Sequence, residues 1–248
     1  MTGVQTCALP ILNKKTGEVI WKSEQPDFGR AGKDGAGYTG VVISQAAGIK
    51  QYVTLTGRGL MGVRASDGKF LWGYNRIANG TADIPTPIVK GDYVFGSSGY
   101  GDGGTALVKL VKAGDGVKAE EVYYLKANEL QNHHGGMILL GDHVYMGHGH
   151  NNGFPTCVEL MTGKVVWGKE RGPGSGSAAI VMADGNLYFR YEDAVMALIE
   201  ATPKGYSLKG SFPLASKNGK SWPHPVIHDG KLYLRDQNDL LCYDVKAK

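Results

Sequence analysis

The sequence predicts an all-β protein whose fold is a β-propeller built from four-stranded antiparallel blades. Three observations lead to this fold class. A strand–turn–strand pattern that ends in tryptophan recurs along the chain, a second pattern of two short strands around a glycine-containing turn precedes most of its copies, and glycine makes up 38 of the 248 residues. Such a glycine share is about twice the average, as expected for a chain with many tight turns.

The tryptophan-ending pattern is clearest in residues 157–167. Val158 and Leu160 alternate with Glu159, which indicates a half-buried strand. Thr162-Gly163 supplies a turn, because glycine accepts a positive φ without steric cost. The β-branched and aromatic run that follows, Val165-Val166-Trp167, is typical of a second strand. Copies of the pattern occupy residues 12–21 and 63–72, weaker copies with longer, degraded turns occupy 107–124 and 195–212, and an incomplete copy occupies 240–245.

The second pattern fixes the repeat length. Each copy has a short apolar strand, a Gly-Asp or Asp-Gly turn and a second strand, and the first apolar residue of that second strand is Val94, Val144, Leu187 or Leu232. Successive differences between these positions are 50, 43 and 45 residues. A period of this size with four strand-like segments is typical of a propeller blade. One such sheet cannot bury both of its faces alone, so the repeats must stack around an axis.

The chain begins with a segment that does not follow the repeat. Residues 1–11 match the translation of a common DNA-sequencing adapter, and they lack the basic region and apolar core of a secretory signal. We therefore expect residues 1–11 to be a non-native artefact and residues 12–248 to form a single partial propeller domain. On this interpretation the chain is the C-terminal part of a longer protein.

The remaining sequence divides into about five blades. Residues 12–22 are expected to be the final hairpin of a blade whose first strand was cut away. Full blades are predicted for residues 38–74, 84–125, 133–169 and 175–214, and a blade with only three strands for residues 222–245. No segment predicts a helix. We expect an open arc, with Trp21 packed near the second repeat and the last sheet left with an exposed edge, through which the fragment would self-associate.

Composition excludes several classes of function. Lys and Arg total 27 against 23 for Asp and Glu, a formal charge of +4, and the basic residues form no stripe. This distribution does not predict nucleic-acid binding, and no apolar run is long enough for a membrane helix. Cys7 lies in the 1–11 segment, and Cys157 and Cys242 are expected to be buried small apolar residues and not a disulfide.

The repeat resembles the quinoprotein-type propeller family, whose repeats are called PQQ-like. The residues that carry the resemblance are the turn-plus-tryptophan signatures at Thr16-Gly17 with Trp21, Asp67-Gly68 with Trp72, and Thr162-Gly163 with Trp167. The resemblance implies a ring of seven or eight blades and an extracytoplasmic, periplasmic location. The family includes dehydrogenases that use pyrroloquinoline quinone and non-catalytic scaffolds such as the outer-membrane assembly lipoprotein. It therefore implies pyrroloquinoline quinone as one candidate cofactor.

Strand directions place the long, irregular connections on one face of the propeller, and we call this the top face. Function concentrates on loops held by a rigid scaffold. Five of the seven histidines fall on the predicted top face, namely His133, His134, His148, His150 and His224. The short Gly-Asp, Asp-Gly and Thr-Gly turns fall on the opposite, bottom face.

Two kinds of site are predicted on the top face. His133, His134, His148 and His150 are candidate ligands of a transition metal; the alternative interpretation is that these rings form hydrogen bonds with loop backbone. Candidate ligand-binding residues are the arginines of an anion-binding rim, together with an off-repeat tryptophan and its neighbouring histidine: Arg58, Arg190, Arg235, Trp222 and His224. Trp21, Trp72 and Trp167 are instead expected to pack between blades.

Two functions remain open at this point. The first is a non-catalytic extracytoplasmic propeller that binds a protein, a glycan or a small molecule on its top face. The alternative is a quinone- or metal-dependent oxidoreductase. The sequence has no adjacent cysteine pair and no carboxylate in a recognisable catalytic pattern, so catalytic residues are not identified.

Overall fold

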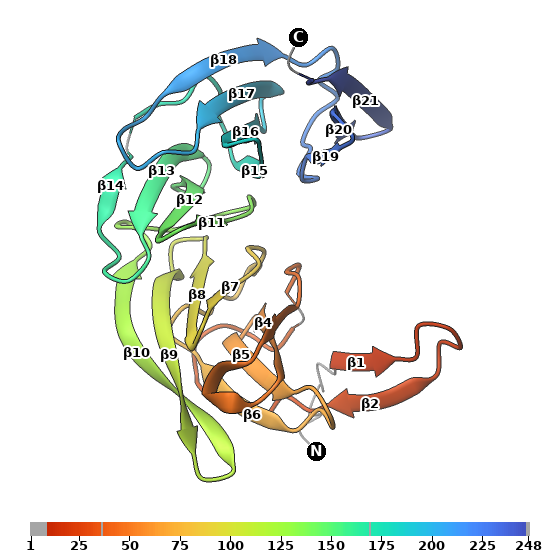
Figure 1. The fold of residues 1–248 in the computed structure, drawn as a ribbon, viewed down its shortest axis with the longest axis vertical. Coiled ribbons are helices and arrows are strands. Elements are labelled where there is room, and N and C mark those ends of the chain that lie inside the picture. The colour runs from red at the N-terminus through yellow and green to blue at the C-terminus, as the bar shows by residue number, and fades with distance from the viewer. Residues whose placement is uncertain (1–8, 36, 169, 247–248) are drawn as a thin grey trace. The chain divides into compact units, whose positions relative to one another are not determined.

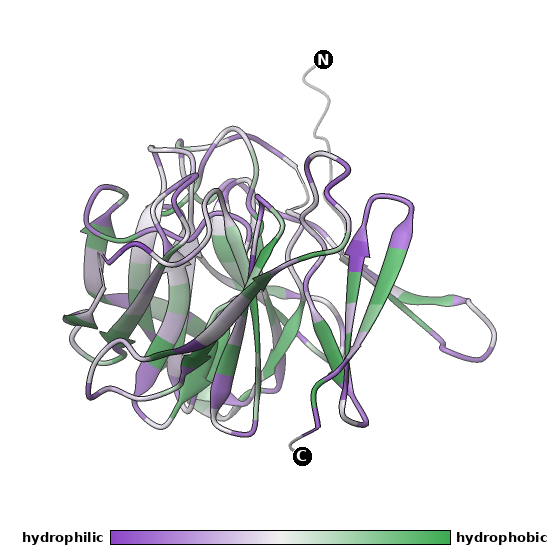
Figure 2. Ribbon diagram, turned by 90° about the horizontal axis from the view of Figure 1, so that it is seen from above, coloured by the Kyte–Doolittle hydropathy of each residue, from purple (hydrophilic) through white to green (hydrophobic). Residues whose placement is uncertain are grey.

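The computed structural model describes residues 9–35, 37–168 and 170–246, and these form six antiparallel sheets with almost no helix. Contacts divide the chain into two compact units, residues 1–127 and 128–248, which we describe separately. Cys7 and most of the 1–11 segment lie outside the described residues. Apolar residues (green) concentrate along the strands, and polar residues (purple) are frequent in the connections (Figure 2).

The first unit contains a two-stranded hairpin and two four-stranded sheets (Figure 1). The strands of the hairpin are β1 (Leu9–Leu12) and β2 (Val19–Ser23). The next sheet has the order β3 (Val42–Ser44), β4 (Gln51–Thr56), β5 (Gly59–Arg64) and β6 (Phe70–Tyr74). The third has β7 (Ile88–Lys90), β8 (Tyr93–Ser98), β9 (Gly104–Ala113) and β10 (Gly116–Lys126). A single 3₁₀ turn, η1 (Ala46–Gly48), joins β3 to β4.

The second unit continues the same topology with two four-stranded sheets and a three-stranded one (Figure 1). The first consists of β11 (Ile138–Leu140), β12 (His143–His148), β13 (Phe154–Glu159) and β14 (Val165–Trp167). The second consists of β15 (Ala178–Ala183), β16 (Asn186–Tyr191), β17 (Val195–Glu200) and β18 (Leu208–Pro213). The last consists of β19 (Val226–His228), β20 (Lys231–Asp236) and β21 (Asp239–Asp244). The predicted blades are therefore confirmed, with boundaries shifted by a few residues.

The Thr-Gly and Asp-Gly turns before the tryptophans contain the same backbone hydrogen bond. The amides of Gly17, Gly68 and Gly163 donate to the carbonyl oxygen four residues earlier, over 2.8, 2.9 and 2.9 Å. The three glycines have φ of 76°, 75° and 71°, a left-handed conformation that other residues adopt only at a cost. The recurrence of the sequence signature thus reflects a recurrent backbone geometry.

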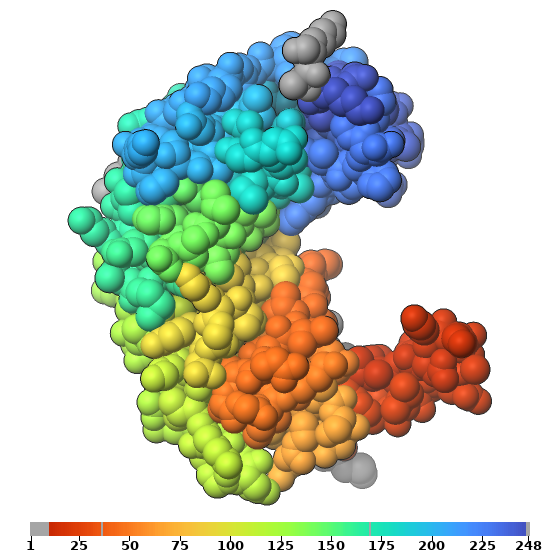
Figure 3. Space-filling model, viewed as in Figure 1, coloured from red at the N-terminus to blue at the C-terminus, as the bar shows by residue number. Residues whose placement is uncertain are grey.

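The core lies between neighbouring sheets, as repeat stacking requires. In the first unit, buried residues of β4–β6 such as Leu60 and Trp72 join Val94 and Val108 of the next sheet in one cluster. The sheets β3–β6 (orange) and β7–β10 (yellow to light green) are in direct contact in the space-filling view (Figure 3). In the second unit, one cluster joins the β11–β14 sheet to the β15–β18 sheet, and another joins that sheet to β19–β21.

The repeat tryptophans fill these interfaces, as predicted. Trp21 lies 6.1 Å from the ring of Tyr52 in the following sheet, measured between centroids. The buried Trp72 indole donates a 2.6 Å hydrogen bond to Gln51 Oε1. Trp167 donates over 2.8 Å to the carbonyl oxygen of Thr202, in the β17–β18 connection of the next blade. Trp72 and Trp167 therefore bury their rings while their indole N–H groups are hydrogen-bonded.

Three sequence-based expectations need correction. The first hairpin is not missing its first strand, because Leu9–Leu12 pairs with Val19–Ser23 and so includes residues of the segment that we expected to be non-native. The weak 107–124 copy has the longest strands, β9 and β10, and a tight turn between them. Cys157 is buried as expected, but Cys242 is exposed, because it pairs with Tyr233 on the sheet face opposite the buried Leu232 and Leu234. The open arc stays a prediction.

Replacing Trp72 with alanine is expected to lower the free energy of unfolding by about 3–5 kcal/mol, since the change removes a large buried ring and leaves a cavity. Chemical denaturation of the purified chain measures this loss. Tyr38→Ala is the control, because the Tyr38 side chain is 79% exposed and its loss should cost less than about 0.5 kcal/mol. Equal losses for the two variants would contradict the assigned interface.

Candidate functional site

Three histidine rings gather at the top end of the second unit. His133 and His134 precede β11 and are both buried. Their rings stack with centroids 3.8 Å apart and an interplanar angle of 23°. The ring of His150, from the β12–β13 connection, lies 4.1 Å from that of His133. The structure thus brings together three of the four predicted histidines, with His133 and His134 stacked and the His150 ring tilted by 34° against His133; we call this group the histidine stack.

Hydrogen bonds fix this stack to its surroundings. His133 Nδ1 lies 2.7 Å from Ser177 Oγ, at the start of the next blade. The imidazole of His224 reaches back from the last blade, with its Nε2 2.9 Å from the carbonyl oxygen of His134. His148 stands slightly apart, where its Nδ1 lies 3.1 Å from the amide nitrogen of Gln131 and 3.3 Å from its carbonyl oxygen. Backbone hydrogen bonding, the simpler of the two interpretations of these rings, is therefore observed for His148 and His224.

The geometry of the stack bears on the metal hypothesis. Rings that stack face to face direct their nitrogen lone pairs outward in the ring planes and not toward a common point. In the described part of the chain, no group of three or more His, Cys, Asp or Glu side chains is arranged to hold a metal ion. Zinc coordination by imidazole needs nitrogens at roughly 2.0–2.1 Å from the metal. Metal binding here stays a prediction, which elemental analysis of the purified, tag-free protein tests.

His133 is neutral near pH 7. Burial, and after it the neighbouring His134 and His150 rings, lower the pKa of His133 to about 3. Burial also lowers the pKa of His134, although the charge of Glu192 opposes this shift. Protonation of either ring would place a cation inside a stack of imidazoles, beside the cationic Lys220. His133 therefore contributes stability only while its ring is neutral.

Acidification is expected to destabilise the second unit. His133 titrates near pH 6.5 in the unfolded chain and near pH 3 when folded, so between these values the unfolded state binds more protons. Its contribution is complete above pH 6.5 and is lost as the pH falls, by about 3 kcal/mol between pH 7 and pH 4.

Urea denaturation across this pH range measures the loss. His133→Asn keeps a hydrogen-bonding partner for Ser177 and should flatten the pH dependence. His228→Asn, which changes an exposed histidine at the bottom end of the unit, should leave it as in the unchanged protein. A His133→Asn variant with the unchanged slope would show that the stack does not set the pH dependence.

Trp222 is the exposed aromatic residue of this surface. Its side chain is 48% exposed, and its ring packs edge-on against His134 with centroids 5.0 Å apart. The Lys220 ammonium group lies 5.9 Å from the centre of the Trp222 ring. A half-exposed indole that is held by a buried ring on one side presents its remaining surface to a ligand or partner.

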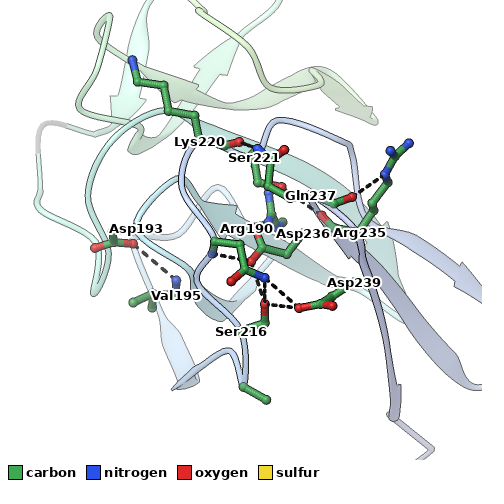
Figure 4. A network of polar contacts seen from close by, with 12 residues as sticks. Arg190, Asp193, Val195, Ser216, Lys220, Ser221, Arg235, Asp236, Gln237 and Asp239 are labelled. Carbon is green, nitrogen blue, oxygen red and sulfur yellow. Dashed lines mark hydrogen bonds and ion pairs between the residues drawn. The ribbon is translucent and has the colours of Figure 1, made fainter.

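Arg190 does not belong to an exposed rim, contrary to the sequence-based expectation. The residue lies on β16 and is only 3% exposed. Its guanidinium group donates a 2.5 Å hydrogen bond to the carbonyl oxygen of Ser221 and lies 3.4 Å from Asp236 Oδ1, on the following blade (Figure 4). Arg190 is thus a buried link between two blades.

Asp236 is the centre of a wider polar network. Ser216 Oγ and the amide nitrogen of Asn218 each donate to Asp236 Oδ2 over 2.9 Å. Burial alone would raise the pKa of Asp236, but these hydrogen bonds, led by that from Asn218, and the charge of Arg190 hold it below its ordinary value. The carboxylate therefore anchors the 214–221 connection, which carries Lys220 (Figure 4) and precedes Trp222 in the sequence.

Removing one partner of this buried pair should cost more than removing both. Arg190→Met leaves a buried carboxylate without its cation, and we expect a loss of about 3–5 kcal/mol in the free energy of unfolding. The double variant Arg190→Met/Asp236→Leu should recover part of that loss. A double-mutant cycle by chemical denaturation measures the coupling, and simple additivity of the two single changes would contradict an interaction between them.

The other two predicted arginines occupy different settings. Arg58, in the first unit, has its Nε 2.7 Å from Asp34 Oδ1, and this contact lowers the pKa of Asp34. Arg235 is exposed, and its Nε donates over 2.9 Å to the carbonyl oxygen of Gln237. Within the second unit, Arg190 and Arg235 lie near the same end of their blades but do not converge on a shared anion site.

Strand register confirms the predicted faces within the second unit. His148 pairs with Phe154 at one end of the β12–β13 ladder, whereas His143 pairs with Glu159 at the other end, beside Gly163. Arg235 lies next to the β20–β21 turn, and Gly230 lies in the β19–β20 turn at the opposite end of β20. The histidine-rich connections and the short glycine turns are thus at opposite ends.

Sequence reasoning assigned no role to several residues that build this surface. Ser177 and Asp236 are buried hydrogen-bonding partners of predicted residues, and Lys220 and Glu192 line the same region. Asp236 ends β20 just before the turn to β21, and Glu192 and Asp193 follow β16 at the equivalent place in the preceding blade. This repeated position of acidic residues is the sequence signal that could have pointed to them. Their pairing follows from blade stacking, which the local sequence does not encode.

Comparisons with known proteins agree with this fold. The family model described as outer membrane protein assembly factor BamB matches residues 4–169. The match begins inside the 1–11 segment, so the division at residue 12 stays a prediction. No curated protein sequence matches the chain.

Solved structures show similarity of fold alone. The β-propeller domain of Cps50 (Swd1) from Myceliophteria thermophila has a TM-score of 0.60 at 12% identity, over 95% of this chain and 75% of that one. Quinohemoprotein alcohol dehydrogenase from Comamonas testosteroni has 0.60 at 14% identity, over 90% and 48%. The computationally designed Ika8 protein has 0.59 at 9% identity, over 93% and 63%. The chain therefore spans less than two thirds of the last two proteins.

Proposed function

Because the chain belongs to the family of the outer membrane protein assembly factor BamB, we propose that it is a non-catalytic extracytoplasmic scaffold that binds another protein. The binding surface is the top end of the second unit, centred on Trp222. The observation that carries this proposal is a half-exposed indole fixed edge-on against the buried His134 ring. Tryptophan is among the residues that dominate binding energy at protein interfaces.

The surroundings of Trp222 support a rigid binding surface. His133 and Ser177 hold the histidine stack against the next blade, and Arg190 and Asp236 hold the 214–221 connection. A side chain that is already fixed before binding loses little conformational freedom when a partner arrives. In this proposal the polar groups beneath the surface hold Trp222 in position and do not take part in a reaction.

The family also supports the extracytoplasmic location. Within the described residues, no helix has the length and apolar character needed to cross a bilayer. The location itself is part of the proposal and rests on the family, whose description names an outer membrane assembly factor.

The alternative, a quinone-dependent oxidoreductase, has less support from the residues present. Pyrroloquinoline quinone is a flat tricyclic carboxylate, and an aromatic platform is the natural support for such a ring. Trp72 and Trp167 are buried between blades, and Trp21 packs on Tyr52. Trp222 covers a ligand from one side only. The described tryptophans therefore do not fit an enclosed quinone, and we derive no step through it.

A thermal melt with and without pyrroloquinoline quinone and Ca²⁺ separates the two functions. A ligand that binds only the folded state raises the melting temperature by mass action. The scaffold proposal predicts no change, and a saturable increase would favour the oxidoreductase.

Photocrosslinking tests the scaffold proposal. Benzoylphenylalanine at position 222 should crosslink in the cell envelope to one partner protein, whereas the same group at Lys204, in the β17–β18 connection at the bottom end, should not. With that partner purified, Trp222→Ala should weaken binding by at least about tenfold, and Lys204→Ala should leave it unchanged. Equal crosslinking at both positions, or full affinity without Trp222, would refute the proposed surface.

A further inference from the structure

A cavity beside Trp222 suggests what chemistry the surface recognises. The cavity has a volume of about 310 Å³ and lies within the second unit. Its lining comes from the 172–177 connection, the β16–β17 turn and the 214–221 connection: Ser175, Gly176, Glu192, Asp193, Lys217, Gly219 and Lys220. Both signs of charge are present, so the state of each charged group decides what the cavity can bind.

The two carboxylates of the lining are already engaged by the protein. Asp193 Oδ2 accepts hydrogen bonds of 2.9 Å from both the amide nitrogen and the hydroxyl of Ser175. Asp193 Oδ1 accepts a further one of 3.3 Å from the amide of Val195 (Figure 4). Glu192 Oε2 accepts one of 3.4 Å from the amide of Ser177. These acids therefore order the wall of the cavity.

The two lysines of the lining form no ion pairs within the described residues, whereas the two carboxylates accept hydrogen bonds from the protein. Lys217 and Lys220 are exposed, and neither ammonium group forms an ion pair with any residue in the described part of the chain. Figure 4 shows the Lys220 side chain extending away from the Arg190–Asp236 network, with no contact drawn at its nitrogen. Each ammonium group offers three hydrogen-bond donors. The ammonium groups of Lys217 and Lys220 are thus available to donate hydrogen bonds to an anionic group of a ligand.

Lys220 also connects the cavity with the aromatic surface. It lines the cavity, and its nitrogen lies 5.9 Å from the centre of the Trp222 ring. Because His134 covers one edge of that indole, the exposed part faces an incoming segment. An anion held by the lysines would therefore sit next to an apolar group held by the tryptophan.

From this arrangement we infer that the cavity binds an acidic side chain of a partner protein, with a neighbouring large apolar side chain packed on Trp222. The inference rests on the proposed function and adds the chemistry of the recognised segment. The recognised element is an aspartate or glutamate next to an aromatic or large aliphatic residue. The attraction between lysine and carboxylate is screened by salt, whereas contact with the indole is not.

Short peptides test the inference directly. The probes are acetylated and amidated decapeptides of glycine and serine that carry a Phe-Asp or an Asp-Phe core, with matched peptides in which Asp becomes Asn or Phe becomes Ala. Titrations followed by amide NMR should move the signals of Gly176, Gly219 and Lys220 for at least one Phe and Asp core. Replacement of Asp by Asn should weaken binding by about fivefold, and replacement of Phe by Ala by about tenfold.

Protein variants separate the two contacts. Lys217→Ala/Lys220→Ala should remove the preference for Asp over Asn and the salt dependence, while Trp222→Ala should remove the preference for Phe over Ala. Lys204→Ala, an exposed lysine at the other end of the unit, should change neither. All four changes are at exposed positions, so the variants should fold, and their melting temperatures check this.

Two results would overturn the inference. One is equal binding of the Asp and Asn peptides, and the other is the absence of any shift at the cavity amides with every peptide. Should the captured partner still require Trp222 but not the two lysines, the scaffold proposal would survive and the acidic preference would fall. Should the partner require neither, the proposed function would fall as well.

Discussion

The structure depends on the burial of sheet faces against neighbouring sheets. Along these strands apolar residues point to both sides, so a single blade cannot exclude water from its own surfaces. The clusters that contain Leu60 and Val94, Cys157 and Phe189, and Met196 and Leu232 each join two neighbouring sheets. Trp72 and Trp167 contribute a large ring to such interfaces, with an indole N–H that finds a hydrogen-bond acceptor. Burial of this apolar area is the main favourable term in folding.

Stacking also decides where function can be located. The bottom turns are short, and the Thr-Gly and Asp-Gly turns among them contain the same backbone hydrogen bond. Their conformation therefore leaves few positions for functional side chains. The top connections are longer, and in the second unit they carry the histidine stack, Lys220 and Trp222. Contacts between blades hold them in place, since Ser177 bonds to His133 and Arg190 bonds to the carbonyl oxygen of Ser221. A buried ion pair adds little net stability, so we interpret Arg190–Asp236 as a device that fixes the position of the connection.

The sequence predicted what is encoded locally. Alternating residues, the Thr-Gly turns and the terminal tryptophans located the blades and the faces correctly, because each depends on residues close together in the chain. The register between blades is not local. Arg190 and Asp236 are separated by 46 positions, and only the packing of two sheets shows that Arg190 is buried and not part of a rim. The exposure of Cys242 likewise depends on which face of its sheet packs against the neighbouring sheet. His133 and His134 were identified by type, but their stacking on His150 and their lowered pKa required the structure.

Hydrogen–deuterium exchange tests the central claim that a buried ion pair positions the binding connection. The comparison is between the unchanged chain and the double variant Arg190→Met/Asp236→Leu, which keeps the volume apolar and avoids an isolated charge. The account predicts faster exchange of amides in residues 215–222, with the amides of β15–β17 as protected as before. Unchanged protection of residues 215–222 in the variant would show that the pair does not hold this connection, and the account of the surface would be wrong.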